Sequence, residues 1–366
     1  MARLPSNLRA RAHVLMKASL LLCGALFIIH SASAQYTITE IPACDTGELG
    51  GLTDRGAMAL TCFIATGSAD PAMAYSFVPS LLDKSGLHQL GEFPPGSTVR
   101  AAGINRHNQV IATRGFLEDA RAYLLTERRA QDLGTLGGSW AMARGINDFG
   151  DVVGASALPD GTKHAFLLRA GIMRDLGAFG AVDSDAWAIN NRGRIVINRT
   201  IATNEHAVTV AAVYSDGVLE EIGSFGGELT FGTAINSRGH VAGISQFPNS
   251  TIDAFFPFFF HEGQMDSVRF YYRGSNPVAT VRSINERDEI VGAWHYSFDG
   301  DDAYGGFLYR DGEATDIADL LPPGSEWSIA SADFINDAGQ IVGAGTHNGE
   351  ARNYLLSPTE SSHRKP

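Results

Sequence analysis

Acidic and aromatic side chains gather most densely between Ala293 and Tyr304. This stretch contains Trp294, His295, Asp299, Asp301, Asp302 and Tyr304. Aromatic rings beside carboxylates suit a sugar or a cationic peptide, because a ring offers an apolar face while a carboxylate accepts hydrogen bonds. We therefore expect a long surface loop here that binds an unknown carbohydrate or protein ligand. Trp140 and Trp327, which follow two predicted crossings between repeats, are expected to join it or to pack between repeats.

The same carboxylates leave an enzyme open as the alternative. A glycoside hydrolase or a lyase would need two carboxylates facing one pocket, about 5 to 10 Å apart. The candidates are Asp299, Asp301, Asp302 and Glu326. No HExxH, GxSxG, P-loop or Rossmann glycine pattern is present. The preferred interpretation is therefore a binding or structural module without catalytic residues, and a matrix protein with many weak contacts is a third possibility.

Neither a metal nor a cofactor is predicted. The histidines are scattered, and no pair has the spacing of metal ligands on one element. Asp183 and Asp185, like the acidic run at 299–302, offer oxygen ligands, but calcium needs roughly six to eight oxygens in a loop folded around it. Neither segment matches the EF-hand pattern, so both are expected to be solvated acidic turns.

Residues 1–34 have the composition of a secretory signal peptide. Four basic residues come first, an apolar run from Ala18 to Ile29 follows, and Ser31-Ala32-Ser33-Ala34 ends the segment. The run is shorter than the roughly 20 residues that span a bilayer, and Leu22 before Cys23 argues against a lipid anchor. We expect cleavage after Ala34 and a secreted or periplasmic protein without a membrane anchor.

The charge of the remaining chain restricts its partners. After this cleavage, 24 basic residues would face 40 acidic residues, a net charge of −16. A field of this sign repels a phosphate backbone. Nucleic acid is therefore not expected as a partner, whereas a neutral or cationic ligand is acceptable, and we expect a monomer.

Two cysteines would remain after cleavage, Cys44 and Cys62. An oxidising compartment favours a disulfide between them. The alternative is a pair of buried apolar thiols, since two cysteines in a chain of this length do not make a disulfide-dependent scaffold. Neither state is expected to be catalytic, because no CxxC spacing surrounds them.

One short motif recurs along the chain. Ile-Asn stands at 104–105, 146–147, 189–190, 235–236, 284–285 and 335–336, and a divergent copy stands at 52–53. The spacing averages about 47 residues, which is typical of repeat architectures. Each repeat holds four short segments rich in β-branched and apolar residues, separated by Gly, Asn and Asp, without helical periodicity. Each repeat is therefore predicted to form four strands.

The turn after each Ile-Asn pair has one restricted position. Three residues after the Asn, or at the matching place, stand Gly56, Asn108, Gly150, Gly193, Gly239, Asp288 and Gly339. Gly, Asn and Asp are the residues that best tolerate a left-handed backbone. A position limited to them predicts a positive φ, and the leading Asn is expected to close the turn by bonding the backbone two residues on.

Seven such units predict an all-β fold. It is a seven-bladed β-propeller of four-stranded antiparallel blades that forms one domain at 35–358, with 359–366 as a disordered tail. The last repeat stops before its fourth strand, whereas residues 36–41 form a spare strand before the first turn. We expect this N-terminal strand to complete the last blade, because a closed ring leaves no exposed sheet edge.

Several motifs in and around the third repeat together resemble a known family. They are Asp132-Leu133-Gly134-Thr135-Leu136-Gly137-Gly138, Ile146-Asn147, Val152-Val153-Gly154 and His164-Ala165-Phe166. The combination is similar to the HAF-repeat family of bacterial extracellular proteins, over nearly all of the chain after residue 34. The resemblance implies an exported, propeller-like protein and brings no reaction or catalytic residue. Because Arg or Gly replaces His164 in other repeats, we expect that residue to begin a strand, not to bind a metal.

Overall fold

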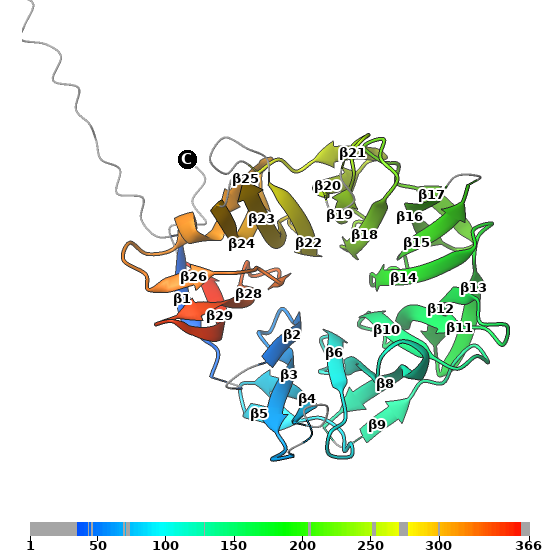
Figure 1. Ribbon diagram of the computed structural model, residues 1–366, viewed down its shortest axis with the longest axis horizontal. Coiled ribbons are helices and arrows are strands. Elements are labelled where there is room, and N and C mark those ends of the chain that lie inside the picture. Colours follow the sequence, from blue (N-terminus) through cyan, green and yellow to red (C-terminus); the bar gives the residue numbers. More distant parts are fainter. Residues whose placement is uncertain are drawn as a thin grey trace, which may run out of the picture. The chain divides into compact units, whose positions relative to one another are not determined.

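The structure, a computed structural model, folds the repeats into seven sheets arranged in sequence order around a central axis (Figure 1). It describes residues 35–42, 44, 47–68, 70, 74–127, 129–203, 206–250, 254–270, 277–298 and 301–359. Every described residue belongs to one unit of the chain. The predicted signal peptide, its cleavage position at Ala34 and the tail from residue 360 lie outside the described residues.

Blades 1 to 6 each consist of four antiparallel strands in sequence order, with the first strand nearest the axis. Blade 1 contains β2 (Gly47–Leu52), β3 (Met58–Ala65), β4 (Tyr75–Asp83) and β5 (Gly86–Gln89). Blade 2 contains β6 (Val99–Ile104), β7 (Val110–Arg114), β8 (Arg121–Thr126) and β9 (Arg129–Asp132). Blade 3 contains β10 (Ala141–Ile146), β11 (Val152–Ala157), β12 (Lys163–Arg169) and β13 (Ile172–Gly177). Blade 4 contains β14 (Asp183–Ile189), β15 (Ile195–Ala202), β16 (Ala207–Ser215) and β17 (Val218–Glu221). Blade 5 contains β18 (Thr230–Ile235), β19 (Val241–Ser245), β20 (Phe256–His261) and β21 (Gln264–Ser267). Blade 6 contains β22 (Val278–Ile284), β23 (Ile290–Phe298), β24 (Asp301–Arg310) and β25 (Glu313–Asp316). Two short 3-10 helices, η2 (Leu117–Asp119) and η3 (Ile317–Leu320), lie in the connections.

Blade 7 brings the two ends of the described chain together. Its strands are β26 (Trp327–Ile329) and β27 (Phe334–Ile335), which both pair with β28 (Ile341–His347), then β29 (Glu350–Pro358) and β1 (Tyr36–Glu40). β1 runs antiparallel to β29, from Tyr36 opposite Pro358 to Glu40 opposite Tyr354. The predicted seven-bladed fold is confirmed, and so is its closure by the N-terminal strand.

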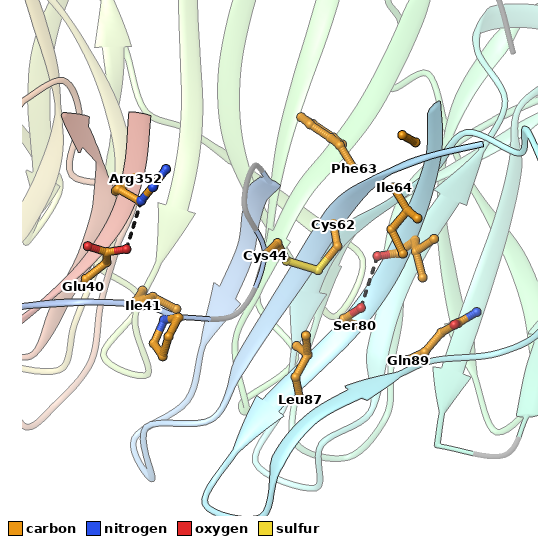
Figure 2. A pocket seen from close by; sticks show the side chains of 13 residues that line it. Glu40, Ile41, Cys44, Cys62, Phe63, Ile64, Ser80, Leu87, Gln89 and Arg352 are labelled. Atoms are coloured by element: carbon orange, nitrogen blue, oxygen red, sulfur yellow. Dashed lines mark hydrogen bonds and ion pairs between the residues drawn. A yellow bond between two sulfur atoms is a disulfide. The ribbon is translucent and has the colours of Figure 1, made fainter. Parts of the chain in front are cut away.

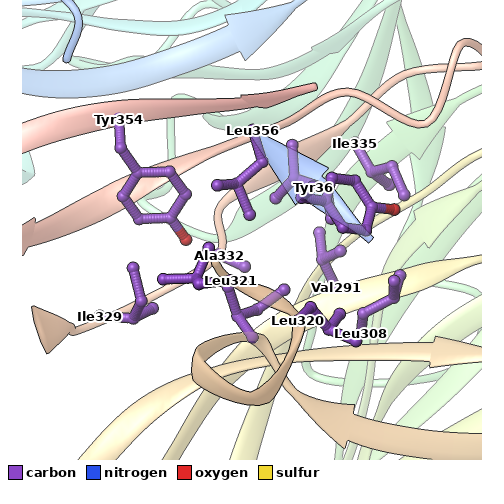
Figure 3. Packing of buried hydrophobic residues seen from close by; sticks show 12 residues of the cluster. Tyr36, Val291, Leu308, Leu320, Leu321, Ile329, Ala332, Ile335, Tyr354 and Leu356 are labelled. Carbon is purple, nitrogen blue, oxygen red and sulfur yellow. The ribbon is translucent and has the colours of Figure 1, made fainter. Parts of the chain in front are cut away.

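A buried apolar cluster holds β1 in the ring (Figure 3). Tyr36 is 0% exposed and packs in this cluster with Val291, Ile335 and Leu356. Its hydroxyl accepts a hydrogen bond from Arg310 Nη2 at 2.6 Å. Burying one such side chain contributes on the order of 2 kcal/mol, so the first strand is anchored by its first residue.

The glycine of the Val152-Val153-Gly154 motif is explained by its steric surroundings. Gly154 lies opposite Phe166 in the next strand, and a Cβ at Gly154 would lie 1.9 Å from the carbonyl oxygen of Met142 and 3.0 Å from the Phe166 ring. The equivalent glycines of three other blades, Gly243, Gly292 and Gly343, face the same two obstacles. Gly at these four positions therefore avoids a clash with both neighbouring strands, whereas Leu60, Ala112 and Ile197 stand at the same register position in blades 1, 2 and 4.

The Ile-Asn turns have the predicted backbone. The seven restricted positions have φ between +59° and +86°. At Asn190, the side-chain Oδ1 accepts from the backbone N–H groups of Arg192 and Arg194, both at 3.0 Å, and the Asn residues of blades 2, 3, 5 and 6 bond in the same way. We call this end of the blades the turn end, and the opposite end, with the blade crossings, the loop end.

The Asn side chains also join neighbouring blades, which was not predicted. Each Nδ2 donates to the backbone carbonyl of the matching residue in the next blade, at 2.8 to 3.3 Å. The pairs are Asn105 to Asn147, Asn147 to Asn190, Asn190 to Asn236, Asn236 to Asn285, Asn285 to Asn336 and Asn336 to Thr53. We call this series the Asn belt. Because Thr53 has no side-chain amide, the belt has six links for seven blades.

Candidate functional site

One cavity at the loop end combines aromatic rings with buried charge. It has a volume of about 580 Å³, within the range of roughly 300–1,000 Å³ that is usual for small-molecule sites. It lies where blades 2, 3 and 4 meet. Its lining residues are Phe116, Glu118, Asp119, Trp140, Met142, Arg144, Ala155, Lys163 and Asp185. We call it the loop-end pocket.

The crossing from blade 2 to blade 3 holds Trp140 at the start of β10. The Trp140 carbonyl accepts from the Ala157 N–H and from Ser156 Oγ, both at 3.0 Å. Just before it, a Cβ at Gly138 would lie 2.4 Å from the carbonyl oxygen of Leu158. The Gly137-Gly138 stretch therefore lets the chain cross closely between the two blades, and it keeps the Trp140 backbone within hydrogen-bonding distance of β11.

A β-bulge positions Arg144. The inner strands of blades 1 to 6 all shift register at the same point, where the extra residue is Gly50, Ala102, Arg144, Trp187, Thr233 or Arg282. A bulge inserts one residue and redirects its side chain. In blade 3 the redirected residue is Arg144, which lines the loop-end pocket and lies over the Trp187 ring, 4.7 Å from its centre.

Arg144 and Asp185 form an incomplete ion pair. Asp185 is 7% exposed, and its Oδ2 lies 3.4 Å from Arg144 Nη2. Two further atoms of the pair, Asp185 Oδ1 and Arg144 Nε, are buried and have no hydrogen-bond partner among the described residues. Burial raises the pKa of Asp185, and the opposing effects of Arg144 and Lys163 are smaller. The pair thus keeps one donor and one acceptor that have no partner among the described residues and that are buried behind the wall of the pocket.

The prediction that Asp183 and Asp185 lie in a solvated turn is wrong. Both belong to β14, the inner strand of blade 4. Ser184 Oγ between them donates to the Gly177 carbonyl and accepts from the Ala165 N–H, both at 2.8 Å. Since these partners lie in blade 3, the polar residues of this segment join two blades and do not face solvent together.

The predicted long loop at 293–304 is also wrong. β23 continues to Phe298 and β24 begins at Asp301, so these residues form a hairpin. Trp294 is 4% exposed, and its ring centre lies 5.4 Å from that of Phe270. Trp294 is therefore a core residue, because the long strand carries it between blades.

Three residues of that hairpin still meet at one cavity. Trp294, His295 and Tyr304 line a mostly apolar space of about 350 Å³ in and beside blade 6. His295 Nε2 lies 2.6 Å from Asp302 Oδ1, and both side chains are more than half exposed. Asp299 and the side chain of Asp301 lie outside the part of the chain that the structure describes. Among the described side chains of this hairpin, Asp302 therefore has no second carboxylate beside it with which it could act.

Trp327 packs within blade 7. Its ring stacks on His347 with ring centres 4.7 Å apart, and it meets Tyr354 edge-on at 5.9 Å. Glu326 beside it is exposed. Of the predicted ligand-binding residues that the structure describes, Trp140 alone lines the loop-end pocket. Phe116, Arg144 and Lys163 were not among the predicted residues.

A groove of about 720 Å³ lies at the seam between blades 7 and 1 (Figure 2). The disulfide between Cys44 and Cys62 forms part of its wall, with a Cα–Cα distance of 5.5 Å. Of the two states that the sequence allowed, the structure contains the bonded one. Glu40 and Arg352 pair at 2.9 Å across the edge of the groove. No described lining residue has a buried polar side-chain atom without a partner, so this groove has less to offer a specific ligand.

The central axis has a smaller cavity of about 210 Å³ beside the Asn belt. The acidic residues around it, Asp54, Asp148, Glu286 and Asp337, each accept a backbone N–H of a neighbouring blade at 2.8 to 2.9 Å. These carboxylates therefore serve the contacts between blades. Among the described residues, no group of three or more His, Cys, Asp and Glu side chains could hold a metal ion. The described helices are all too short to cross a membrane.

Comparison with known proteins bears on the fold. No family model matches the sequence, and no curated protein matches it. The β-propeller domain of the Trilobed protease from Pyrococcus furiosus, described as having an open velcro topology, is similar with a TM-score of 0.54 at 9% identity, covering 86% of this chain and 94% of that one. Acylaminoacyl peptidase from Pyrococcus horikoshii has a TM-score of 0.51 at 11% identity over 87% of this chain, which spans about half, 52%, of that protein. At these identities the likeness shows the fold alone: the chain is a β-propeller, here of seven blades that are closed by β1.

Proposed function

We propose that this protein is an exported, non-catalytic binding module of the HAF-repeat type, and that the loop-end pocket is its ligand site. The ligand is a carbohydrate or a peptide. The rigid ring of blades supplies the scaffold, and the variable loop end supplies the specific side chains, which is the usual division in binding proteins. We also propose that it acts as a monomer.

One observation carries this proposal. The loop-end pocket is lined by Trp140 and by Phe116, which is 72% exposed, beside the charged residues Arg144, Lys163 and Asp185. Aromatic rings beside several charged groups are the lining expected of a ligand site, because the rings offer apolar contact area and the charged groups can fix the orientation of a ligand.

The experiment is a screen of the purified protein against immobilised glycans and peptides. Any hit is tested again with Trp140→Ala, which removes one aromatic wall of the pocket. The matched control is Tyr304→Ala, which removes an aromatic ring that is 60% exposed at the other loop-end cavity. We expect at least a tenfold loss of affinity for Trp140→Ala alone. Equal loss in both variants would contradict the assignment of the site.

An enzyme remains the second candidate, because Asp185 is a buried acid whose pKa is raised. A carboxyl group of this kind can stay protonated and act as a general acid, as a glycoside hydrolase or lyase requires. The test is the release of reducing or unsaturated sugar ends from a polysaccharide panel. Turnover that disappears in Asp185→Asn would favour the enzyme over the binding module.

Export is tested separately. We propose that the chain is cleaved after Ala34, so that the secreted or periplasmic protein starts at Gln35. Terminal sequencing of the protein recovered outside the cytoplasm is expected to give Gln35 as its first residue. Recovery of an uncleaved chain from the cytoplasm would contradict this part of the proposal.

A further inference from the structure

We infer that a second ligand site lies at the turn end, in a pocket between blades 1 and 2 that binds a compact ligand with two oxyanion groups. The pocket has a volume of about 710 Å³, within the range of roughly 300–1,000 Å³ that is usual for small-molecule sites. Its lining residues are Asp54, Arg55, Ala57, Asp83, Lys84, Ser85, Arg106, His107 and Asn108. We call it the turn-end pocket. It shares no lining residue with the loop-end pocket, so this inference goes beyond the proposed function and does not depend on it.

Blade 1 departs from the repeat at one position that lines this pocket. Four residues after the leading Asn, or after Thr53 in blade 1, the seven turns contain Ala57, Gln109, Asp151, Arg194, His240, Glu289 and Gln340. Six of these residues have large polar side chains, whereas blade 1 has only the methyl group of Ala57. The turn of blade 1 is therefore the one in which this side chain cannot extend toward the next blade.

In the other blades this side chain, or a residue bonded to it, covers the restricted position of the next blade. A Cβ on the glycine at that position would lie 3.7 Å from Gln340 Oε1, 3.4 Å from Gln109 Oε1 and 1.9 Å from Arg194 Nη1. The cover in the remaining three blades is His240 bonded to Asp288, Arg169 bonded to Asp151, and Arg287 bonded to Glu289. At the junction of blades 1 and 2, Asn108 instead donates to Asp83 Oδ2 at 3.5 Å, and the space that a cover would fill is the turn-end pocket.

The lining of the turn-end pocket is basic, although the protein as a whole is acidic. Arg55, Lys84 and Arg106 stand against two carboxylates, whereas the chain after residue 34 has a net charge of −16. Arg55 and Lys84 are exposed and form no ion pair with any described residue. Arg106 Nε lies 3.8 Å from Asp148 Oδ2, which is a long contact. The pocket therefore offers two unpaired cations and a third that is weakly paired.

The two carboxylates of the lining already have partners within the protein. Asp54 Oδ1 accepts the backbone N–H of Asp337 at 2.9 Å. Asp83 Oδ1 accepts the backbone N–H of Ser85 at 2.8 Å, in addition to the bond from Asn108 to its other oxygen. These acidic side chains hold the turns in place, and the basic side chains remain for a ligand.

Two unpaired cations on separate hairpins favour a ligand with two anionic groups. Arg55 lies between β2 and β3, and Lys84 lies between β4 and β5. A guanidinium bonds a carboxylate or phosphate through two parallel N–H groups, and an ammonium adds a point charge. A dicarboxylate and a diphosphate share this chemistry. A long polyanion fits less well, because the carboxylates around the central axis lie at the same end of the blades and would repel its further charges.

The experiment is calorimetric titration of the purified protein at low salt with four probes. Pyrophosphate and succinate each carry two oxyanion groups, succinamide is the neutral analogue of succinate, and heparin is a long polyanion. We expect pyrophosphate, succinate or both to bind and succinamide not to bind. Binding should weaken as the salt concentration rises, because salt screens exposed charges.

Three variants test the site. Arg55→Gln and Lys84→Gln each remove one cation at an exposed position, and each should weaken binding at least fivefold. Ala57→Gln gives blade 1 the residue of blades 2 and 7 and should fill the pocket, with a loss of tenfold or more. Arg192→Gln is the matched control and should bind unchanged, because Arg192 occupies the place of Arg55 in blade 4 and is exposed, but does not line the pocket.

The probes also distinguish the source of the anion. Binding of pyrophosphate alone supports a phosphate ligand, binding of succinate alone supports a carboxylate ligand, and binding of both supports the shared chemistry. Equal binding of succinate and succinamide would overturn the oxyanion requirement. Tighter binding of heparin than of either small anion would overturn the compact ligand.

The variants decide whether the turn-end pocket is the site. Failure of every probe to bind would overturn the inference. So would anion binding that Arg55→Gln and Lys84→Gln leave unchanged, or that Arg192→Gln weakens as much. Circular dichroism of Ala57→Gln separates a filled pocket from loss of folding, since Ala57 is buried. Trp140→Ala should leave anion binding unchanged, so a negative result here does not touch the loop-end pocket or the proposed function.

Discussion

Glu289 and Asp185 are both buried carboxylates, 5% and 7% exposed, at opposite ends of the blades. At the turn end, Glu289 accepts hydrogen bonds from Asn285, Arg287 and Arg310. Burial raises its pKa, but these bonds and charges outweigh burial, and the pKa lies below its usual value. Asp185 at the loop end has the long hydrogen bond from Arg144 and the charges of Arg144 and Lys163, but burial outweighs them and its pKa is raised.

The comparison of Glu289 with Asp185 shows how the two ends of the blades differ. The bonds of Glu289 continue through Arg310 to Tyr36 and through Asn285 to the Asn belt, so the turn end is a satisfied network that closes the ring. At the loop end, Asp185 Oδ1 and Arg144 Nε have no hydrogen-bond partner among the described residues. Under the proposed function, the turn end outside the turn-end pocket serves stability and the loop end serves recognition, and variants at each end test this division.

The largest effect is expected from Tyr36→Ala at the turn end. The change empties part of a buried cluster and removes the hydroxyl that Arg310 bonds. Replacing a large buried aromatic residue costs about 3–5 kcal/mol, which urea unfolding measures directly. Thr37→Ala on the same strand, where the side chain is exposed, should cost less than about 0.5 kcal/mol. Equal losses would mean that β1 does not close the ring through Tyr36.

The next largest loss of stability is expected at Asn190, where two variants separate the turn bonds from the belt bond. Asn190→Ala removes two turn bonds and the belt bond to Asn236, and about 3 kcal/mol of stability should be lost at roughly 1 kcal/mol for each bond. Asn190→Asp keeps the turn acceptor but lacks the Nδ2 donor, so its loss should be intermediate. Thermal unfolding of both variants is the measurement. If Asn190→Asp unfolds like the unmodified protein, the belt contributes nothing.

A smaller effect depends on pH at the loop end. Asp316 accepts the Ala318 N–H at 2.9 Å at the start of η3, and burial raises its pKa to about 6. Because the folded state holds this proton more tightly than the unfolded state, stability is highest at low pH and falls as the pH rises from about 4 to about 6. Asp316→Asn stays neutral and should gain on the order of 2 kcal/mol at pH 7 and nothing at pH 4. Melting temperatures at the two pH values test this, and an equal difference at both would contradict it.

The smallest expected effect is a gain of stability from a substitution at the turn end. Thr53→Asn supplies the amide that blade 1 lacks, directed at the Asn105 carbonyl, and should add the seventh belt link. One net hydrogen bond is worth about 1 kcal/mol, which thermal unfolding detects. Thr53→Val is the control: it removes the hydroxyl that bonds the Ala57 N–H and C=O groups and should lower stability. A melting temperature for Thr53→Asn below that of the unmodified protein would show that the belt cannot close there.

The turn end was largely predictable because its chemistry is local. A position limited to Gly, Asn and Asp three residues after an Asn already implies a left-handed turn, and all seven positions have it. The missing strand at one end and the spare strand at the other implied closure. The belt was missed because each of its bonds joins residues more than 40 positions apart.

The loop-end pocket was predictable only through Trp140. Its decisive pair, Arg144 and Asp185, stands 41 positions apart on different blades. One signal was present in the sequence: the residue three positions before each Asn varies among Ala102, Arg144, Trp187, Thr233 and Arg282, although the Ile-Asn pair after it is constant. This variation distinguishes the bulge position from the constant Ile-Asn pair after it.

The number of blades, the place of each tight turn and the strand that completes the ring follow from the sequence by itself, because strand patterns and turn residues act over a few neighbouring positions. Only the tertiary structure decided that 293–304 is a hairpin, that Asp185 is buried and that Arg144 faces it. Those properties arise where one blade packs against the next, and desolvation depends on what the neighbouring blade places beside each charge.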